Sequence, residues 1–221
     1  MKDKAPTLNR VYRELRKEVL RGDYVPGHQL DLSEIRVRHK ASDTPVRNAV
    51  NRLVGEGLLK NTSHGGYYLP HVTEDHVRDL IGFSLRELIL GTEEAEVVGR
   101  TIAPLPSNLA HGNVLVTTEA LFREIAKSGG ERARRTMEHV NDELHAIRLA
   151  EPLLIDDLQV ELEGLIKACA AKDWQILRER LKDYHLLRLQ LVPRLVTVLY
   201  ADRGGVEGAS DEARENYQYR R

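Results

Sequence analysis

Hydrophobic residues recur three or four positions apart near the start of the chain, and this spacing predicts short helices separated by turns. The first helix is expected over residues 7–21 and ends at a glycine. A turn built on a Pro-Gly pair follows. A second, shorter helix is predicted within residues 31–40, with Asp31 or Ser33 as its capping residue.

A third helix carries the clearest start signal in the chain. Ser42 can cap its free amide groups, and Pro45 falls in the first turn, where its missing N–H does no harm. The apolar face of this helix consists of Val46, Ala49, Val50 and Leu53. Its polar face carries Thr44, Arg47, Asn48, Asn51 and Arg52. Side chains of these types bond phosphate oxygens or base edges, so this face is a candidate DNA-binding surface.

Two short strands are predicted after the third helix, over residues 58–60 and 67–69, because two apolar runs flank the polar turn NTSHGG. Three short helices followed by a small hairpin are typical of a winged helix-turn-helix domain. We therefore expect a flexible start over residues 1–7 and a DNA-binding domain over residues 8–71.

The rest of the chain shows only helical spacing, so the expected fold class is mainly α, with an all-helical domain over residues 72–200. Helices are predicted over residues 73–102, 114–128, 131–150, 153–171 and 173–200. Thr73 and Thr92 are candidate caps in the helix over residues 73–102, and the helix-breaking segment APLPSNLAHGN follows that helix. Pro193 is expected to bend the helix over residues 173–200. The polar tail over residues 201–221 is expected to be disordered. Such a bundle can enclose a small-molecule pocket.

Charge is distributed unevenly between these two parts. Residues 1–70 hold 13 Lys and Arg against 8 Asp and Glu, whereas residues 71–221 hold 20 against 26. Clustered cations bind phosphate by releasing counterions, so the N-terminal part is expected to bind DNA. The alternative explanation of this charge difference between the two parts is chance.

A single cysteine excludes a disulfide framework. The sequence has neither a signal peptide nor a run of 18 apolar residues, which favours a cytoplasmic protein.

Catalysis has little support in the sequence. Cys169 lies in the apolar run LIKACAA and is better explained as a small core residue than as a nucleophile. The chain contains no G-x-S-x-G, H-E-x-x-H or nucleotide-binding motif. A binding protein is therefore favoured over an enzyme.

Several blocks within residues 8–75 occur in the order and at the spacing of one known family. They are the turn GDYVPGHQL, the helix start SDTPVRNA and the wing sequence EGLLKNTSHGGYYL. The segment resembles the DNA-binding domain of GntR-family bacterial regulators. The resemblance implies a homodimeric transcription regulator, often a repressor, that sets its third helix into the major groove of an inverted repeat. The residues then expected to contact DNA are Arg36, Arg38, Ser42, Thr44, Arg47, Asn48, Asn51, Arg52, Gly65 and Gly66.

Two residues depart from the pattern of that family. Asp43 stands where the family commonly has Arg, and Ser33 stands where a basic residue is frequent. A carboxylate that faces phosphate repels it, which predicts binding with an altered sequence preference. Alternatively, Asp43 interacts with the dipole at the start of the third helix and has a structural role only.

The C-terminal part is similar to the FCD effector domain of one large GntR subgroup, in its short, six-helix variety. The matching segments are TEDHVRDLIGFSLREL, LFREIAKSGG and LIKACAAKDWQILRERLKDYH. Many such domains bind a divalent metal through an Asp-x-x-x-His pair and two later histidines. The corresponding positions here hold Glu119, Arg123, Leu162 and Tyr184, with His185 one residue out of register. Because Arg and Leu do not ligate metals, we expect neither a metal nor another cofactor.

A pocket for a small organic anion is expected instead, with arginine in place of the metal. Its candidate residues are Arg86, Glu119, Arg123, His145, Arg148, Tyr184 and His185. For Glu119 and Arg123 the alternative is a surface ion pair, and for His145 it is a packed or solvent-facing ring. Two other functions stay open, a metal-dependent regulator of the same type and a ligand- or partner-binding protein with a weakened DNA-binding surface.

Overall fold

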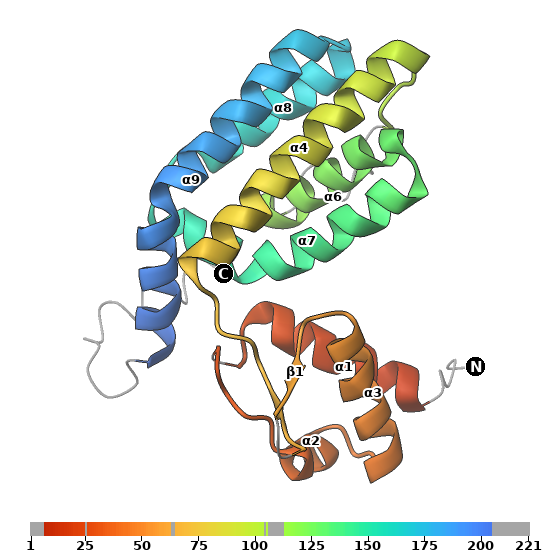
Figure 1. The fold of residues 1–221 in the computed structure, drawn as a ribbon, viewed down its shortest axis with the longest axis vertical. Coiled ribbons are helices and arrows are strands. Elements are labelled where there is room, and N and C mark those ends of the chain that lie inside the picture. Colours follow the sequence, from red (N-terminus) through yellow and green to blue (C-terminus); the bar gives the residue numbers. More distant parts are fainter. Residues whose placement is uncertain (1–6, 25, 63–64, 104, 106–112, 205–221) are drawn as a thin grey trace.

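The computed structural model describes residues 7–24, 26–62, 65–103, 105 and 113–204. Figure 1 shows a small N-terminal group of elements and a larger bundle of long helices, joined by an extended linker. Buried apolar residues form a separate core in each group. The mainly α fold with an N-terminal winged helix-turn-helix, expected from the sequence, is confirmed.

The N-terminal group is built on three helices whose apolar faces meet. They are α1 (Thr7–Arg21), α2 (Leu32–Arg38) and α3 (Asp43–Gly55). Their core includes Val11, Leu15, Val46, Ala49, Val50 and Leu53, none of which retains exposed surface. Full burial of a Val or Leu side chain contributes about 1.5–3 kcal/mol, so the spacing of apolar residues accounts for the packing of these short helices.

The predicted caps of α2 and α3 have different outcomes. Asp31, and not Ser33, caps α2, because its carboxylate accepts a hydrogen bond from the backbone N–H of Ser33 at 2.6 Å. Ser42 occupies the N-cap position of α3 with extended backbone, but its side chain makes no capping hydrogen bond. The predicted capping role of Ser42 is therefore wrong, whereas Pro45 lies in the first turn as expected.

The wing is an antiparallel hairpin of two strands, β1 (Lys60–Asn61) and β2 (Tyr67–Tyr68). The first predicted strand began two residues too early. Leu58 and Leu59 turn into the core instead, and both of their N–H groups lie within hydrogen-bond distance of the Leu53 carbonyl. Gln29 forms an additional isolated bridge with Tyr68, which places the segment after α1 beside the hairpin.

Among the residues that the structure describes, five long helices make up the bundle. They are α4 (Glu74–Val98), α6 (Val114–Ala126), α7 (Glu131–Ala150), α8 (Leu158–Ala171) and α9 (Trp174–Gly204), with short 3-10 turns at Lys127–Gly129 and Glu151–Leu153. Figure 1 shows α4 running alongside α9, with α6 and α7 on its other side. In the described part of the chain, none of the helices is long and apolar enough to cross a membrane.

Helix α4 begins as predicted but ends four residues early. The Thr73 hydroxyl caps it by accepting a hydrogen bond from the His76 N–H at 3.3 Å. Thr92 caps nothing, because it lies buried inside α4 and its hydroxyl donates to the Ile89 carbonyl at 2.7 Å. The helix ends where Gly99 adopts a left-handed backbone, with φ of 67°.

Helix α8 starts at Leu158 rather than at residue 153, since a 3-10 turn precedes it. Helix α9 is longer than predicted and ends at Gly204, so residues 201–204 of the tail expected to be disordered are helical. Residues 205–221 of that tail, and residues 104 and 106–112 of the breaker segment, lie outside the described residues.

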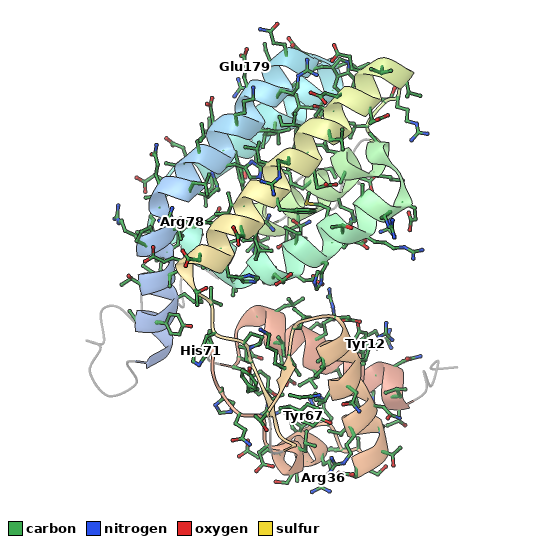
Figure 2. The ribbon with its side chains drawn as sticks, viewed as in Figure 1. Tyr12, Arg36, Tyr67, His71, Arg78 and Glu179 are labelled. Atoms are coloured by element: carbon green, nitrogen blue, oxygen red, sulfur yellow. The ribbon has the colours of Figure 1, made fainter. Side chains whose placement is uncertain are left out.

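Helix α9 continues through Pro193, and Figure 1 shows the change of direction expected for it. Proline has no N–H to donate to the carbonyl of Leu189, one helical turn earlier. Arg78 of α4 satisfies that carbonyl, with Nη1 donating at 2.9 Å. Figure 2 shows Arg78 where α4 meets the lower half of α9, so the bend is also a point of attachment between the two helices.

The N-terminal group meets the bundle where α1 lies beside α7 (Figure 1). Arg16 of α1 forms an ion pair with Asp142 of α7. The linker is held by α9, because the N–H of Val72 donates to the Tyr200 hydroxyl at 3.0 Å and that hydroxyl donates to the Val72 carbonyl at 3.2 Å.

Candidate nucleic-acid interface and ligand cavity

The outer side of α3 presents a continuous polar surface, which we call the α3 face. It consists of Thr44, Arg47, Asn48, Asn51 and Arg52, all of them exposed. The opposite side of α3 is buried in the core, and this fixes which side chains point outward. Figure 2 shows Arg36 at the end of the domain that lies away from the bundle. An exposed helix with such side chains has the chemistry for major-groove contacts.

Asp43 holds two arginines at the start of α3. Its carboxylate accepts a hydrogen bond from Arg47 Nε at 2.6 Å, and Arg36 Nη1 lies 3.4 Å from its other oxygen. All three side chains are about half exposed. Asp43 is thus an internal counter-charge for Arg36 and Arg47, an arrangement that neither interpretation of the sequence included.

Arg38 forms contacts within its own domain. Its Nη1 donates to Glu18 Oε2 at 3.2 Å and to the Tyr24 hydroxyl at 3.0 Å. Burial, reinforced by the Glu18 carboxylate, raises the pKa of Tyr24 to about 12, so this phenol stays protonated. The structure therefore gives Arg38 a packing role, and its contact with DNA stays a prediction.

The two wing glycines expected near DNA occupy constrained positions. Gly65 has φ of 86°, which favours glycine. A Cβ at Gly66 would lie 2.6 Å from Gln29 Nε2. The Tyr67 hydroxyl donates to Asn51 Oδ1 at 2.9 Å, and this bond ties the wing to the α3 face.

A chain of polar contacts connects α3 to the bundle. The guanidinium carbon of Arg52 lies 3.7 Å from the centre of the Tyr12 ring, and Arg52 Nε donates to Glu56 at 3.2 Å. Glu56 also accepts a hydrogen bond from the Tyr12 hydroxyl at 2.7 Å and lies 3.7 Å from Arg16 Nε. Arg16 in turn pairs with Asp142 of α7. Sequence reasoning missed these contacts because they join three helices.

A cavity of about 570 Å³ lies where the bundle faces α1. Its walls are mainly apolar and include Leu20, Val114, Leu115, Leu149, Pro152 and Leu158. The charged residues at its wall are Lys17, Arg21, Arg148, Glu151, Glu161 and Arg188. Small-molecule sites typically measure about 300–1,000 Å³ and combine apolar walls with a few polar groups, so this cavity has the size and chemistry of such a site.

Arg188 is the most deeply buried charge at the cavity, with 2% of its surface exposed. Its Nη2 donates to Glu151 at 3.0 Å and to Glu161 at 2.7 Å, and its guanidinium carbon lies 3.4 Å from the centre of the Tyr184 ring. Burial raises the pKa of Glu151, although the Arg188 guanidinium opposes this. The sequence prediction included Tyr184 but missed the other three residues. The signal in the sequence that could have identified Arg188 is its position within the apolar stripe of α9, where a charged residue is unexpected.

Arg148 is likewise neutralised from within the protein. Its Nη1 donates to Asn141 Oδ1 at 3.0 Å and lies 3.3 Å from Glu119 Oε1. The same Glu119 oxygen lies 2.8 Å from His145 Nδ1. The structure thus brings together three of the predicted effector-site residues, Glu119, His145 and Arg148.

Arg86 and Arg123 lie apart from this cluster. The guanidinium of Arg86 lies 5.9 Å from the ring centre of Phe83, on a different part of the surface. Arg123 Nε lies 3.9 Å from Glu138, whereas Glu119 pairs with His145 and Arg148. The i,i+4 ion pair considered for Arg123 is therefore replaced by contacts between helices.

His185 is buried in the bundle core. Its Nδ1 lies 2.6 Å from the Leu181 carbonyl, to which it donates, and its Nε2 lies 3.1 Å from the Ser84 hydroxyl. Burial lowers the pKa of His185 to about 3, so the ring is neutral at physiological pH. Leu162 belongs to the same apolar core. Among the residues that the structure describes, no three His, Cys, Asp or Glu side chains converge as metal ligands.

These features define a protein with an N-terminal winged helix-turn-helix domain, the type of domain that binds DNA, and a second, helical domain. Residues 7–69 match the family described as bacterial regulatory proteins, gntR family. The N-terminal segment is therefore a GntR-type helix-turn-helix domain, in agreement with the resemblance inferred from its motifs.

Relatives were found for longer parts of the chain. The uncharacterized HTH-type transcriptional regulator YdhC of Bacillus subtilis (strain 168) is 22% identical over 158 residues, which cover 65% of this chain and 70% of that protein. The HTH-type transcriptional repressor GlaR of Escherichia coli (strain K12) is 29% identical over 69 residues, which cover 31% of each protein. The crystal structure of a putative transcriptional regulator GntR from Rhodococcus sp. RHA1 superposes on this chain with a TM-score of 0.67.

That structure is 17% identical in sequence, and the match covers 85% of this chain and 98% of the other, so it demonstrates the shared fold. The relatives are transcriptional regulators and not enzymes. The comparisons therefore support a DNA-binding regulator and confirm the expectation that the chain is not an enzyme.

Proposed function

We propose that this protein is a cytoplasmic homodimeric repressor that binds an inverted-repeat operator and is controlled by a small-molecule effector. The observation that carries the proposal is the exposed α3 face on a GntR-type domain. A two-fold dimer presents this face twice, and each copy contacts one half-site.

Within the α3 face, Arg47 is the strongest candidate for a base contact. Its side chain is about half exposed, and Asp43 accepts a hydrogen bond from its Nε. A guanidinium has two terminal nitrogens that can donate to the two acceptors of guanine. Asn48 and Asn51 carry amides suited to adenine. Arg36, Ser42, Thr44 and the wing glycines complete a surface for phosphate contacts.

The helical domain, over residues 72–200, is proposed to be of the FCD type and to bind the effector. The cavity supports this assignment, because it combines apolar walls with His145 and Arg148, both of which contact Glu119 behind the wall residues. The buried arginines Arg148 and Arg188 already have carboxylate partners. An organic anion therefore needs a further cation at the cavity wall.

DNA binding is tested by fluorescence anisotropy with labelled duplexes that tile the region upstream of the gene encoding this protein. Arg47→Ala is expected to weaken binding of the tightest duplex by about 1–3 kcal/mol. Arg135→Ala is the matched control, because it removes the same charge from an exposed position on α7. Equal binding by wild type and Arg47→Ala would refute the role of the α3 face.

A further inference from the structure

The cavity has walls from both domains. Lys17, Leu20 and Arg21 of α1 lie at its wall opposite the ends of α7 and α8. Sequence reasoning placed the effector site wholly within the bundle. The structure adds a wall from the DNA-binding domain, so a molecule that fills the cavity contacts both domains at once.

The charges of the cavity are asymmetric. On the bundle side, Arg188 is held by Glu151 and Glu161, and Arg148 by Glu119. These guanidiniums are compensated and are costly to separate from their partners. An incoming anion therefore gains little from them.

On the α1 side, the cations are less compensated. Lys17 is exposed and forms no ion pair within the described part of the chain. Arg21 pairs with Asp23 at 2.8 Å, and its side chain is still 63% exposed. Leu20, between these two cations, belongs to the apolar wall. The α1 wall thus offers an unpaired positive charge beside an apolar surface.

We infer that this cavity binds an organic acid with an apolar body, whose carboxylate faces Lys17 and Arg21 of α1 while its body packs against the bundle wall. The apolar part is retained by Val114, Leu149 and Leu158. The carboxylate forms charge-assisted hydrogen bonds with the cations of α1. The ligand therefore bridges the DNA-binding domain and the helical domain.

A ligand that contacts both domains can affect the position of the α3 face through helix α1. Helix α1 carries Arg16, which contacts both Glu56 after α3 and Asp142 of α7. The ligand changes DNA affinity only if its own affinity differs between the arrangement of α1 and the bundle that binds DNA and the arrangement that does not. This regulatory consequence rests on the proposed function, whereas the binding site does not.

The site is tested by isothermal titration with octanoate, phenylbutyrate and naphthoate, each compared with the primary alcohol of the same carbon skeleton. At least one carboxylate is expected to bind about three- to tenfold more tightly than its alcohol. The Lys17→Gln, Arg21→Gln double variant is expected to lose this preference and to keep the affinity for the alcohol. The control is Arg135→Gln with Lys167→Gln, which makes the same charge change at exposed positions in the bundle.

A second variant tests the apolar wall. Val116 lies at the cavity and is 42% exposed, so Val116→Trp fills space there without disturbing the core. It is expected to abolish binding of acid and alcohol alike, with an unchanged circular dichroism spectrum. Failure of every carboxylate to bind wild type, or undiminished acid preference in the double variant, would overturn the inferred site.

DNA binding is measured on the same samples. Intact DNA binding without carboxylate binding would refute the site and leave the proposed function standing. Carboxylate binding in a protein that binds no DNA would refute the proposed function and leave the site standing.

Discussion

Acid is expected to destabilise the helical domain through His185. Burial lowers the pKa of this ring to about 3 in the folded protein, whereas an unfolded histidine has a pKa of about 6.5. As the pH falls below 6.5, the unfolded state binds a proton that the folded state does not. Stability due to this residue is therefore complete above about pH 6.5 and is lost progressively down to about pH 3.

The size of the effect follows from these two values. Each pH unit within the window costs about 1.4 kcal/mol, so His185 accounts for a loss of about 2 kcal/mol between pH 7 and pH 5. His185→Gln lowers stability at pH 7, because it disturbs the contacts with Leu181 and Ser84. Its further loss between pH 7 and pH 5 is expected to be about 2 kcal/mol smaller than that of wild type.

Urea unfolding at the two pH values measures this difference. Trp174 is the single tryptophan of the chain and packs against the bundle core, so its fluorescence reports on the helical domain. His28→Gln is the control, since it makes the same substitution at an exposed histidine outside the bundle. Equal losses in wild type and His185→Gln would refute the burial argument.

Two further substitutions test the DNA-binding domain and the bundle. Asp43→Asn should tighten binding to non-specific duplex and steepen the slope of log affinity against log salt by about 1, because it frees positive charge for phosphate contact. Anisotropy titrations at two salt concentrations measure this slope, and an unchanged slope contradicts the prediction. Gly91→Ala should lower the free energy of unfolding by about 1–3 kcal/mol, since its Cβ would lie 2.6 Å from the Ile125 carbonyl oxygen. Gly82→Ala on the same helix is the control, because a Cβ there would lie 3.4 Å from the end of a flexible side chain. It should leave the free energy of unfolding unchanged or raise it in the same urea assay. Equal effects of the two substitutions would contradict the packing explanation.

Local patterns in the sequence were sufficient to predict most of the fold. The predicted first helix has the observed bounds of α1, and the apolar stripe of α3 is the buried one, because amphipathic spacing determines which face is buried. Helix ends were predicted less well. The hydroxyl of Thr92 satisfies a carbonyl within α4, and the sequence alone does not distinguish this from a capping role.

The candidate site was predicted only in part, because its geometry depends on contacts between helices. Glu119, His145 and Arg148 were each named as candidate pocket residues, and they come together from α6 and α7, a grouping that the sequence did not predict. The partners of Arg188 and the ion pair of Arg16 with Asp142 depend on how distant helices pack, and residue spacing within one helix does not encode this.

In vitro selection from a random duplex library measures sequence-specific DNA binding by the α3 face. Wild-type protein is expected to enrich an inverted repeat, with one specific base pair in each half-site contacted by Arg47. Arg47→Ala should relax the preference at that base pair in both half-sites, while Arg135→Ala should enrich the wild-type sequence. Enrichment of no sequence by wild type would contradict sequence-specific binding, and enrichment of the same sequence with undiminished preference by Arg47→Ala would contradict a base contact by Arg47.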